Sequence, residues 1–109
     1  EAQRDAEIDA AATLPAPTPT DVASACDAVV DAYDDFMKRG PEKDALAWFD
    51  GRRKKLAERR AACVTQGHVK VAACQSQALM APLPSLGELP RTDAATRVLT
   101  RCADKFGAS

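Results

Sequence analysis

The placement of the cysteines constrains this fold more than any other feature of the sequence. The chain of 109 residues contains Cys26, Cys63, Cys74 and Cys102, and no two of them form a CxxC pair. Structural zinc usually takes two ligands from one short knuckle and dithiol redox sites use CxxC, so this spacing argues against both. Two disulfides in an exported protein are the favoured prediction, and four buried thiols in a cytosolic protein are the alternative.

The core implied by the composition is small. Aromatic residues make up 5% of the chain, while alanine is abundant. Helices can pack closely across alanine, but each contact removes little apolar area from water, at about 25 cal/mol per Å². At this length we expect one domain with one modest core, which disulfides would help to stabilise.

Four segments show helical periodicity, and each carries one cysteine. The first is predicted to begin at Thr18 as N-cap and to end at Gly40. The others are expected over residues 41–66, from after the turn at Gly67 and His68 to about Met80, and from Thr92 as N-cap to Gly107. No stretch alternates with the period of a strand. We therefore predict an all-α fold, a small four-helix bundle over residues 18–109 stapled by two disulfides.

The second helical segment changes character at Gly51. Its first half contains Leu46, Trp48 and Phe49, which predict a broad apolar face. Its second half is crowded with basic residues and leaves room for only a narrow buried side. Glycine costs about 1 kcal/mol relative to alanine within a helix, so a kink or break at Gly51 is expected.

Residues 1–17 are predicted to form an acidic, Pro-rich N-terminal extension. The stretch over residues 1–13 would be a marginal helix at best in isolation, and alternating prolines then favour an extended connection. We expect a tether or a clasp rather than a core element. The start at Glu1, without an initiator methionine, fits a mature exported chain and equally an artificially shortened one.

Hairpin geometry ranks the disulfide pairings. Cys74 lies eight residues before Pro82 and Cys102 ten after Thr92, so their levels nearly match. Cys26 and Cys63 are mismatched by about 12 Å along straight helices, which a break at Gly51 would shorten. We favour Cys26–Cys63 with Cys74–Cys102, and the competing pairing is Cys63–Cys74 with Cys26–Cys102.

Charge is strongly segregated although the formal total is −1. Residues 21–50 contain eight acidic and three basic side chains, a net charge of −5, and residues 51–70 contain one acidic and seven basic, a net charge of +6. The predicted partner-binding residues lie here: Trp48, Arg52, Arg53, Lys55, Arg59 and Arg60.

This basic run has three interpretations. It pairs with the acidic face of the first helix, which would place Asp27 and Asp31 near residues 50–55; or it docks an acidic protein; or it contacts nucleic acid or anionic lipid. Nucleic acid is disfavoured, because the chain lacks a basic total, a recognised motif and interleaved aromatic residues.

Catalytic chemistry finds little support in the sequence. The one histidine, His68, follows a turn glycine, where capping or solvent contact is its favoured role, and no catalytic, phosphate-binding or calcium-binding motif occurs. The acidic residues of the first helix point outward and favour a solvated face over a metal site. We expect neither enzymatic activity, nor a cofactor, nor a metal.

The favoured function is therefore a non-enzymatic protein-binding module that meets an acidic partner in the periplasm, the cell envelope or the medium. An adaptor, inhibitor, immunity-type or secretion-system accessory protein would fit. The alternatives are a carrier of a small apolar ligand, and a binder of anionic polymer or lipid through residues 52–60. No apolar run approaches the roughly 20 residues of a membrane span, so membrane contact is expected only through an upstream anchor.

Overall fold

The computed structural model describes residues 1–107, and its regular elements are helices. In chain order these are α1 (Ala2–Ala11), α2 (Val22–Lys38), α3 (Glu42–Trp48), α4 (Arg52–Gln66), α5 (Val69–Met80), the 3₁₀ turn η1 (Pro84–Leu86) and α6 (Arg91–Phe106). No strand occurs in this part of the chain, which confirms the all-α prediction. Six α-helices replace the predicted four, because residues 41–66 form two helices and the N-terminal segment forms another.

Two predicted helix starts are wrong by a few residues. Helix α2 begins at Val22, and its N-cap is Asp21, whose carboxylate accepts hydrogen bonds from the backbone N–H (2.9 Å) and hydroxyl (2.7 Å) of Ser24. The hydroxyl of Thr18 instead donates to the carbonyl of Pro15 at 2.9 Å and so supports the preceding turn. Helix α6 begins at Arg91, one residue before the predicted cap Thr92.

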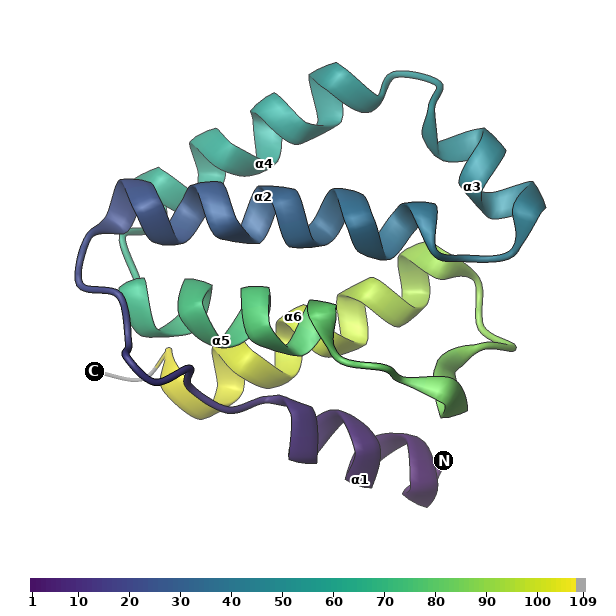
Figure 1. Cartoon of the computed structure of the whole chain (residues 1–109), viewed down its shortest axis with the longest axis horizontal. Helices are drawn as coiled ribbons and strands as arrows, with labels where there is room; N and C mark the ends of the chain where they lie inside the picture. The colour runs from purple at the N-terminus through teal and green to yellow at the C-terminus, as the bar shows by residue number, and fades with distance from the viewer. Residues whose placement is uncertain (108–109) are drawn as a thin grey trace.

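Helix α2 lies at the centre of the fold (Figure 1). It packs along α5 on one side and α4 on the other, and α5 packs in turn on α6, which gives the order α4, α2, α5, α6. The shortest dimension of the molecule, 21 Å, is about two helix diameters. Among these four helices α4 lies at one edge, and α6, which α1 partly covers, lies at the other.

The core is concentrated where α2, α5 and α6 meet. Its largest fully buried apolar side chains are Phe36, Leu79, Leu86, Val29 and Val98. Alanines of α5 and α6 lie between these residues and let the helices approach closely, as the composition predicts. A smaller cluster of Ala25, Val29 and Ala72 lies beside Cys63 at the other end of α2.

The N-terminal segment belongs to the core, contrary to the expectation of a tether or clasp. Ile8 and Ala12 are buried in the main cluster. The ammonium group of Lys105 on α6 donates to the carbonyl groups of Asp9 (2.8 Å) and Ala12 (2.9 Å) at the end of α1. A helix too weak to form alone is thus stabilised by packing and by the capping of its C-terminal carbonyl groups.

The disulfides have the favoured pairing, with Cα–Cα distances of 5.8 Å for Cys26–Cys63 and 5.7 Å for Cys74–Cys102. The mismatch of the first pair disappears because Gly51 takes a left-handed φ of 71° and breaks the helix. Helix α3 is therefore not part of the helical length that separates Cys63 from the start of α4. Cys26 is twelve residues before the end of α2 and Cys63 eleven after the start of α4, so their levels match.

Arg91 connects three helices at one end of the molecule. Its Nε donates to the carbonyl of Phe36 at 2.8 Å, and its guanidinium carbon Cζ lies over the Phe36 ring, 3.6 Å from the centroid. Its backbone N–H donates to Asp44 of α3 at 3.1 Å. Gly40 allows this contact, because a Cβ there would lie 2.8 Å from Cδ of Arg91.

Gly40→Ala should therefore lower the free energy of unfolding by about 1–3 kcal/mol, since the added methyl group displaces a buried side chain. Gly87→Ala is the matched control, because the nearest atom to its Cβ is the Pro84 carbonyl oxygen at 3.4 Å. Urea unfolding of both variants provides the test. Equal stability of the two would contradict the assigned packing of Arg91.

Removal of each disulfide should affect a different part of the fold. Their sequence separations of 37 and 28 residues predict nearly equal chain-entropy contributions, about 3–4 kcal/mol each. Replacing Cys74 and Cys102 with alanine also opens a cavity in the core, since both are fully buried.

Replacing Cys26 and Cys63 with alanine should instead free α4 while the other helices stay folded. Hydrogen exchange should show α4 amides unprotected in this variant, with α5 and α6 amides still protected. Loss of protection in all helices at once would show that α4 is part of the global folding unit.

Candidate functional site

Helix α4 has no buried residue, unlike the other α-helices of residues 1–107. Its half-buried positions are spaced four, three and four residues apart, so they share one face of the helix. They are Arg52, Leu56, Arg59 and Cys63. Two arginines thus occupy positions that a conventional helical seam fills with apolar residues, and polar contacts with α2 must replace part of the hydrophobic packing.

Asp34 of α2 is the centre of these contacts. Its Oδ1 accepts hydrogen bonds from Nε of Arg52 at 2.6 Å and from the indole of Trp48 at 2.8 Å. Lys38 lies 3.0 Å from Oδ2. The hydrogen bonds from Arg52 hold the pKa of Asp34 well below its usual range, against the opposing effect of burial, and Trp48 and Lys38 lower it further.

A second ion pair lies two turns away, where Nε of Arg60 donates to Asp27 at 2.7 Å. The acidic face of α2 therefore pairs with the basic run, as the first interpretation holds. The predicted position of Asp27 along the second helix is wrong, because Asp27 lies opposite residue 60 rather than residues 50–55. The break at Gly51 moves α4 along α2 and produces this shift.

Trp48 is placed inside the fold. Its side chain is buried, and its ring meets that of Tyr33 edge to face with centroids 5.5 Å apart. Together with the hydrogen bond to Asp34, this contact fixes the end of α3 against α2. Of the predicted partner-binding residues, Trp48 is thus a buried packing residue rather than a surface contact.

Leu46 of α3 (64%) and Phe49, which follows the helix as its C-cap (56%), are instead exposed, so the predicted broad apolar face is wrong. The break at Gly51 leaves α3 only seven residues long, and it buries only Trp48. Exposed large apolar side chains one turn apart are common at protein-binding surfaces. Gly51 and the charged residues that follow Phe49 were the sequence signal that this apolar face ends before the next helix.

The outer face of α4 carries further cations. Arg53 and Lys54 are exposed, and neither has a carboxylate within 4.0 Å in residues 1–107. They follow directly on α3 and its two exposed apolar side chains. We call Leu46, Phe49, Arg53 and Lys54 the α3–α4 edge.

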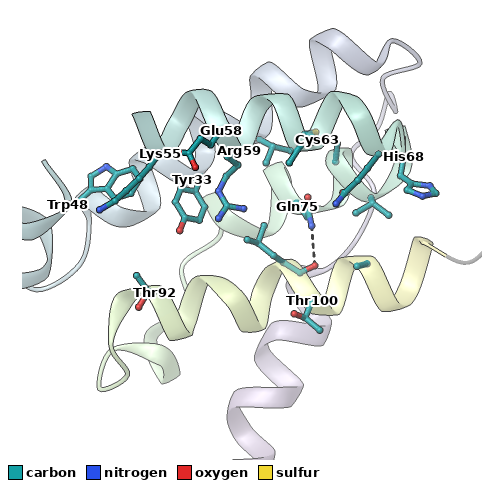
Figure 2. Close-up of a pocket in the computed structure, with 17 residues that line it drawn as sticks. Tyr33, Trp48, Lys55, Glu58, Arg59, Cys63, His68, Gln75, Thr92 and Thr100 are labelled. Atoms are coloured by element: carbon teal, nitrogen blue, oxygen red, sulfur yellow. Dashed lines mark hydrogen bonds between the residues drawn. The ribbon is translucent and has the colours of Figure 1, made fainter. Parts of the chain in front are cut away.

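A groove with a volume of about 720 Å³ separates α4 from α6, and we call it the α4–α6 groove (Figure 2). Val29 and Tyr33 of α2 and residues of α5 form its floor. Lys55 and Arg59 line the α4 side, each over an aromatic ring. Lys55 Nζ is 5.7 Å from the Trp48 ring centroid, and the Arg59 guanidinium is 3.9 Å from that of Tyr33.

The predicted partner-binding residues are thus divided by the fold. Arg52 and Arg60 pair with α2, Arg53 faces outward, and Lys55 and Arg59 face the groove. Neighbouring residues along a helix point in different directions, so the side chains of a continuous basic run make three kinds of contact.

His68 is exposed at the start of α5 and lies at one end of the groove. Within residues 1–107, no group of three or more His, Cys, Asp or Glu side chains is placed to hold a metal ion. None of the helices in this range has the length and apolar character that crossing a membrane requires.

No protein-family model, curated protein or solved structure matches this chain. Its fold and site define a small all-helical domain with two disulfides and one basic edge. Two disulfides are typical of an oxidising compartment.

Asp34→Asn should destabilise the protein at pH 7 by about 1–3 kcal/mol, because Arg52 then loses its charged partner. The carboxylate has a lower pKa in the folded state than in the unfolded state, so its contribution is present above the unfolded pKa, about 3.9. It is lost as the pH falls below that value.

The stability difference between native protein and Asp34→Asn should therefore shrink between about pH 5 and pH 2. Urea unfolding at several pH values measures this. Asp31→Asn changes an exposed carboxylate of the same helix and should cost less than about 0.5 kcal/mol at pH 7. A pH-independent cost for Asp34→Asn would contradict the ion pair.

Proposed function

We propose that this chain is an exported, non-enzymatic protein-binding module that recognises an acidic surface of its partner. The observation that carries the proposal is the α3–α4 edge, where exposed Leu46 and Phe49 are followed within a few residues by exposed Arg53 and Lys54. Apolar anchors beside cations form the kind of patch from which protein interfaces gain affinity and selectivity.

The charge distribution supports an acidic partner. The acidic side chains of α2 that lie against α4 are engaged by Arg52 and Arg60, so the cations of the α3–α4 edge are left to an external partner. A desolvated apolar centre would supply most of the affinity, and the surrounding cations would speed association and reject basic surfaces.

The disulfides support export to the periplasm, the cell envelope or the medium. In such compartments the two bonds persist, and they stabilise a core built largely from alanine. An adaptor, an inhibitor, an immunity-type protein and a secretion-system accessory protein share this chemistry. The α4–α6 groove is open and has a charged wall, which favours a peptide or protein over a small apolar ligand.

The double variant Arg53→Glu/Lys54→Glu should weaken partner binding by at least about tenfold while its melting temperature changes little, because both side chains are exposed. The matched variant Arg52→Glu/Arg60→Glu carries the same charge change but breaks both ion pairs with α2, so its stability should fall. Thermal unfolding separates the two variants.

Binding is measured in two steps. Immobilised protein retains partners from an extract of the source cells, and each retained protein is then purified and titrated by calorimetry at several salt concentrations. The proposal requires one stoichiometric acidic protein whose affinity falls with salt. Retention of nucleic acid or anionic vesicles alone, or equal binding by the Arg53→Glu/Lys54→Glu variant, would refute it.

A further inference from the structure

We propose that the α4–α6 groove binds an extended acidic segment of a polypeptide, so that carboxylates of the segment meet Lys55 and Arg59. This inference rests on the proposed protein-binding function and places a second contact region beside the α3–α4 edge. Figure 2 shows Arg59 and Tyr33 pointing into the space between α4 and α6.

The first support is the state of the cations in the groove. In residues 1–107, no carboxylate lies within 4.0 Å of a side-chain nitrogen of Lys55 or Arg59, whereas Arg52 and Arg60 on the same helix both have acidic partners. Glu58 is the one acidic residue among those that line the groove, and it is exposed. The groove therefore keeps a positive excess.

The second support is the arrangement of Arg59. Its guanidinium lies 3.9 Å from the centroid of the Tyr33 ring, and that ring is itself held by Trp48. A guanidinium stacked on an aromatic face keeps its edge donors for a planar anion and loses little freedom on binding. Such an arrangement suits bidentate recognition of a carboxylate.

The remaining walls offer groups that can bond to a peptide backbone. Thr92 and Thr100 lie along the α6 side, eight residues or about 12 Å apart. On the floor, Nε2 of Gln75 donates to the carbonyl of Leu99 at 3.1 Å, which fixes the orientation of the amide. In the described residues no donor is bonded to its amide oxygen, so the oxygen can accept from a ligand N–H.

The length and openness of the groove favour a chain over a small molecule. Its lining on α4 extends from Lys55 to Gln66, eleven residues or about 16 Å of helix. An extended peptide of about five residues covers this distance. The groove is open to solvent along its side, so a longer segment can enter and leave at its ends.

The test uses the intact, oxidised protein and a displayed library of random peptides about twelve residues long. Selected peptides are synthesised, and their dissociation constants are measured by fluorescence anisotropy. We expect peptides rich in Asp and Glu. Lys55→Glu should weaken their binding by at least about tenfold. Lys43→Glu, an equal charge change at an exposed position of α3 that lines neither the groove nor the α3–α4 edge, should weaken it by less than about threefold.

A second pair of variants avoids the cations of the groove. Ala103→Glu places a carboxylate on the exposed α6 wall and should also weaken binding by about tenfold. Ala61→Glu adds the same charge at an exposed position outside the groove lining and should have little effect. Circular dichroism establishes that each variant is folded.

Four results would overturn the proposal: a selection without binders, binders without acidic residues, equal effects of Lys43→Glu and Lys55→Glu, or unchanged binding to Ala103→Glu. The purified partner separates this failure from failure of the proposed function. A partner lost by Arg53→Glu/Lys54→Glu but retained by Lys55→Glu and Ala103→Glu would refute the groove and leave the protein-binding function intact.

Discussion

Helix α4 is attached to α2 by a disulfide, two ion pairs and an arginine stacked on a tyrosine, with only Leu56 and Cys63 contributing half-buried apolar packing. This arrangement depends on α2, because the two arginines on the inner face of α4, Arg52 and Arg59, need partners that compensate for partial desolvation. Asp34 is the partner of Arg52, and the Tyr33 ring is the partner of Arg59. Once Asp34 and Asp27 engage Arg52 and Arg60, the other cations of α4 are left at the surface. The polar attachment of α4 and the basic character of the candidate site therefore both result from the many cations of α4.

The two disulfides serve different parts of this structure. Cys74–Cys102 lies in the main cluster and joins α5 to α6 where alanine packing already brings the helices close. Cys26–Cys63 lies at the far end of α2, beside a cluster of only three small buried residues. There the covalent bond replaces a hydrophobic seam that the sequence of α4 does not contain, and it keeps one wall of the α4–α6 groove in place.

The sparse apolar packing of α4 leaves the two proposed recognition surfaces next to each other. The α3–α4 edge combines exposed apolar side chains with cations, and the α4–α6 groove combines aromatic-stacked cations with hydroxyl and amide groups. Both are carried by a helix fixed at its two ends, by Asp34 near its start and by Cys63 near its end. A partner would therefore meet a preorganised surface, which reduces the ordering cost of binding.

The sequence by itself predicted the helical class, an interruption at Gly51 and the favoured disulfide pairing, because these follow from local periodicity and helix geometry. Only the tertiary structure decided that Ile8 and Ala12 join the core, since a weak helix is stabilised by packing against distant residues. Tertiary packing also buried Trp48, exposed Leu46 and Phe49, and set the partners of each arginine. Those outcomes depend on how far α4 is displaced along α2 after the break, a quantity that local sequence does not encode.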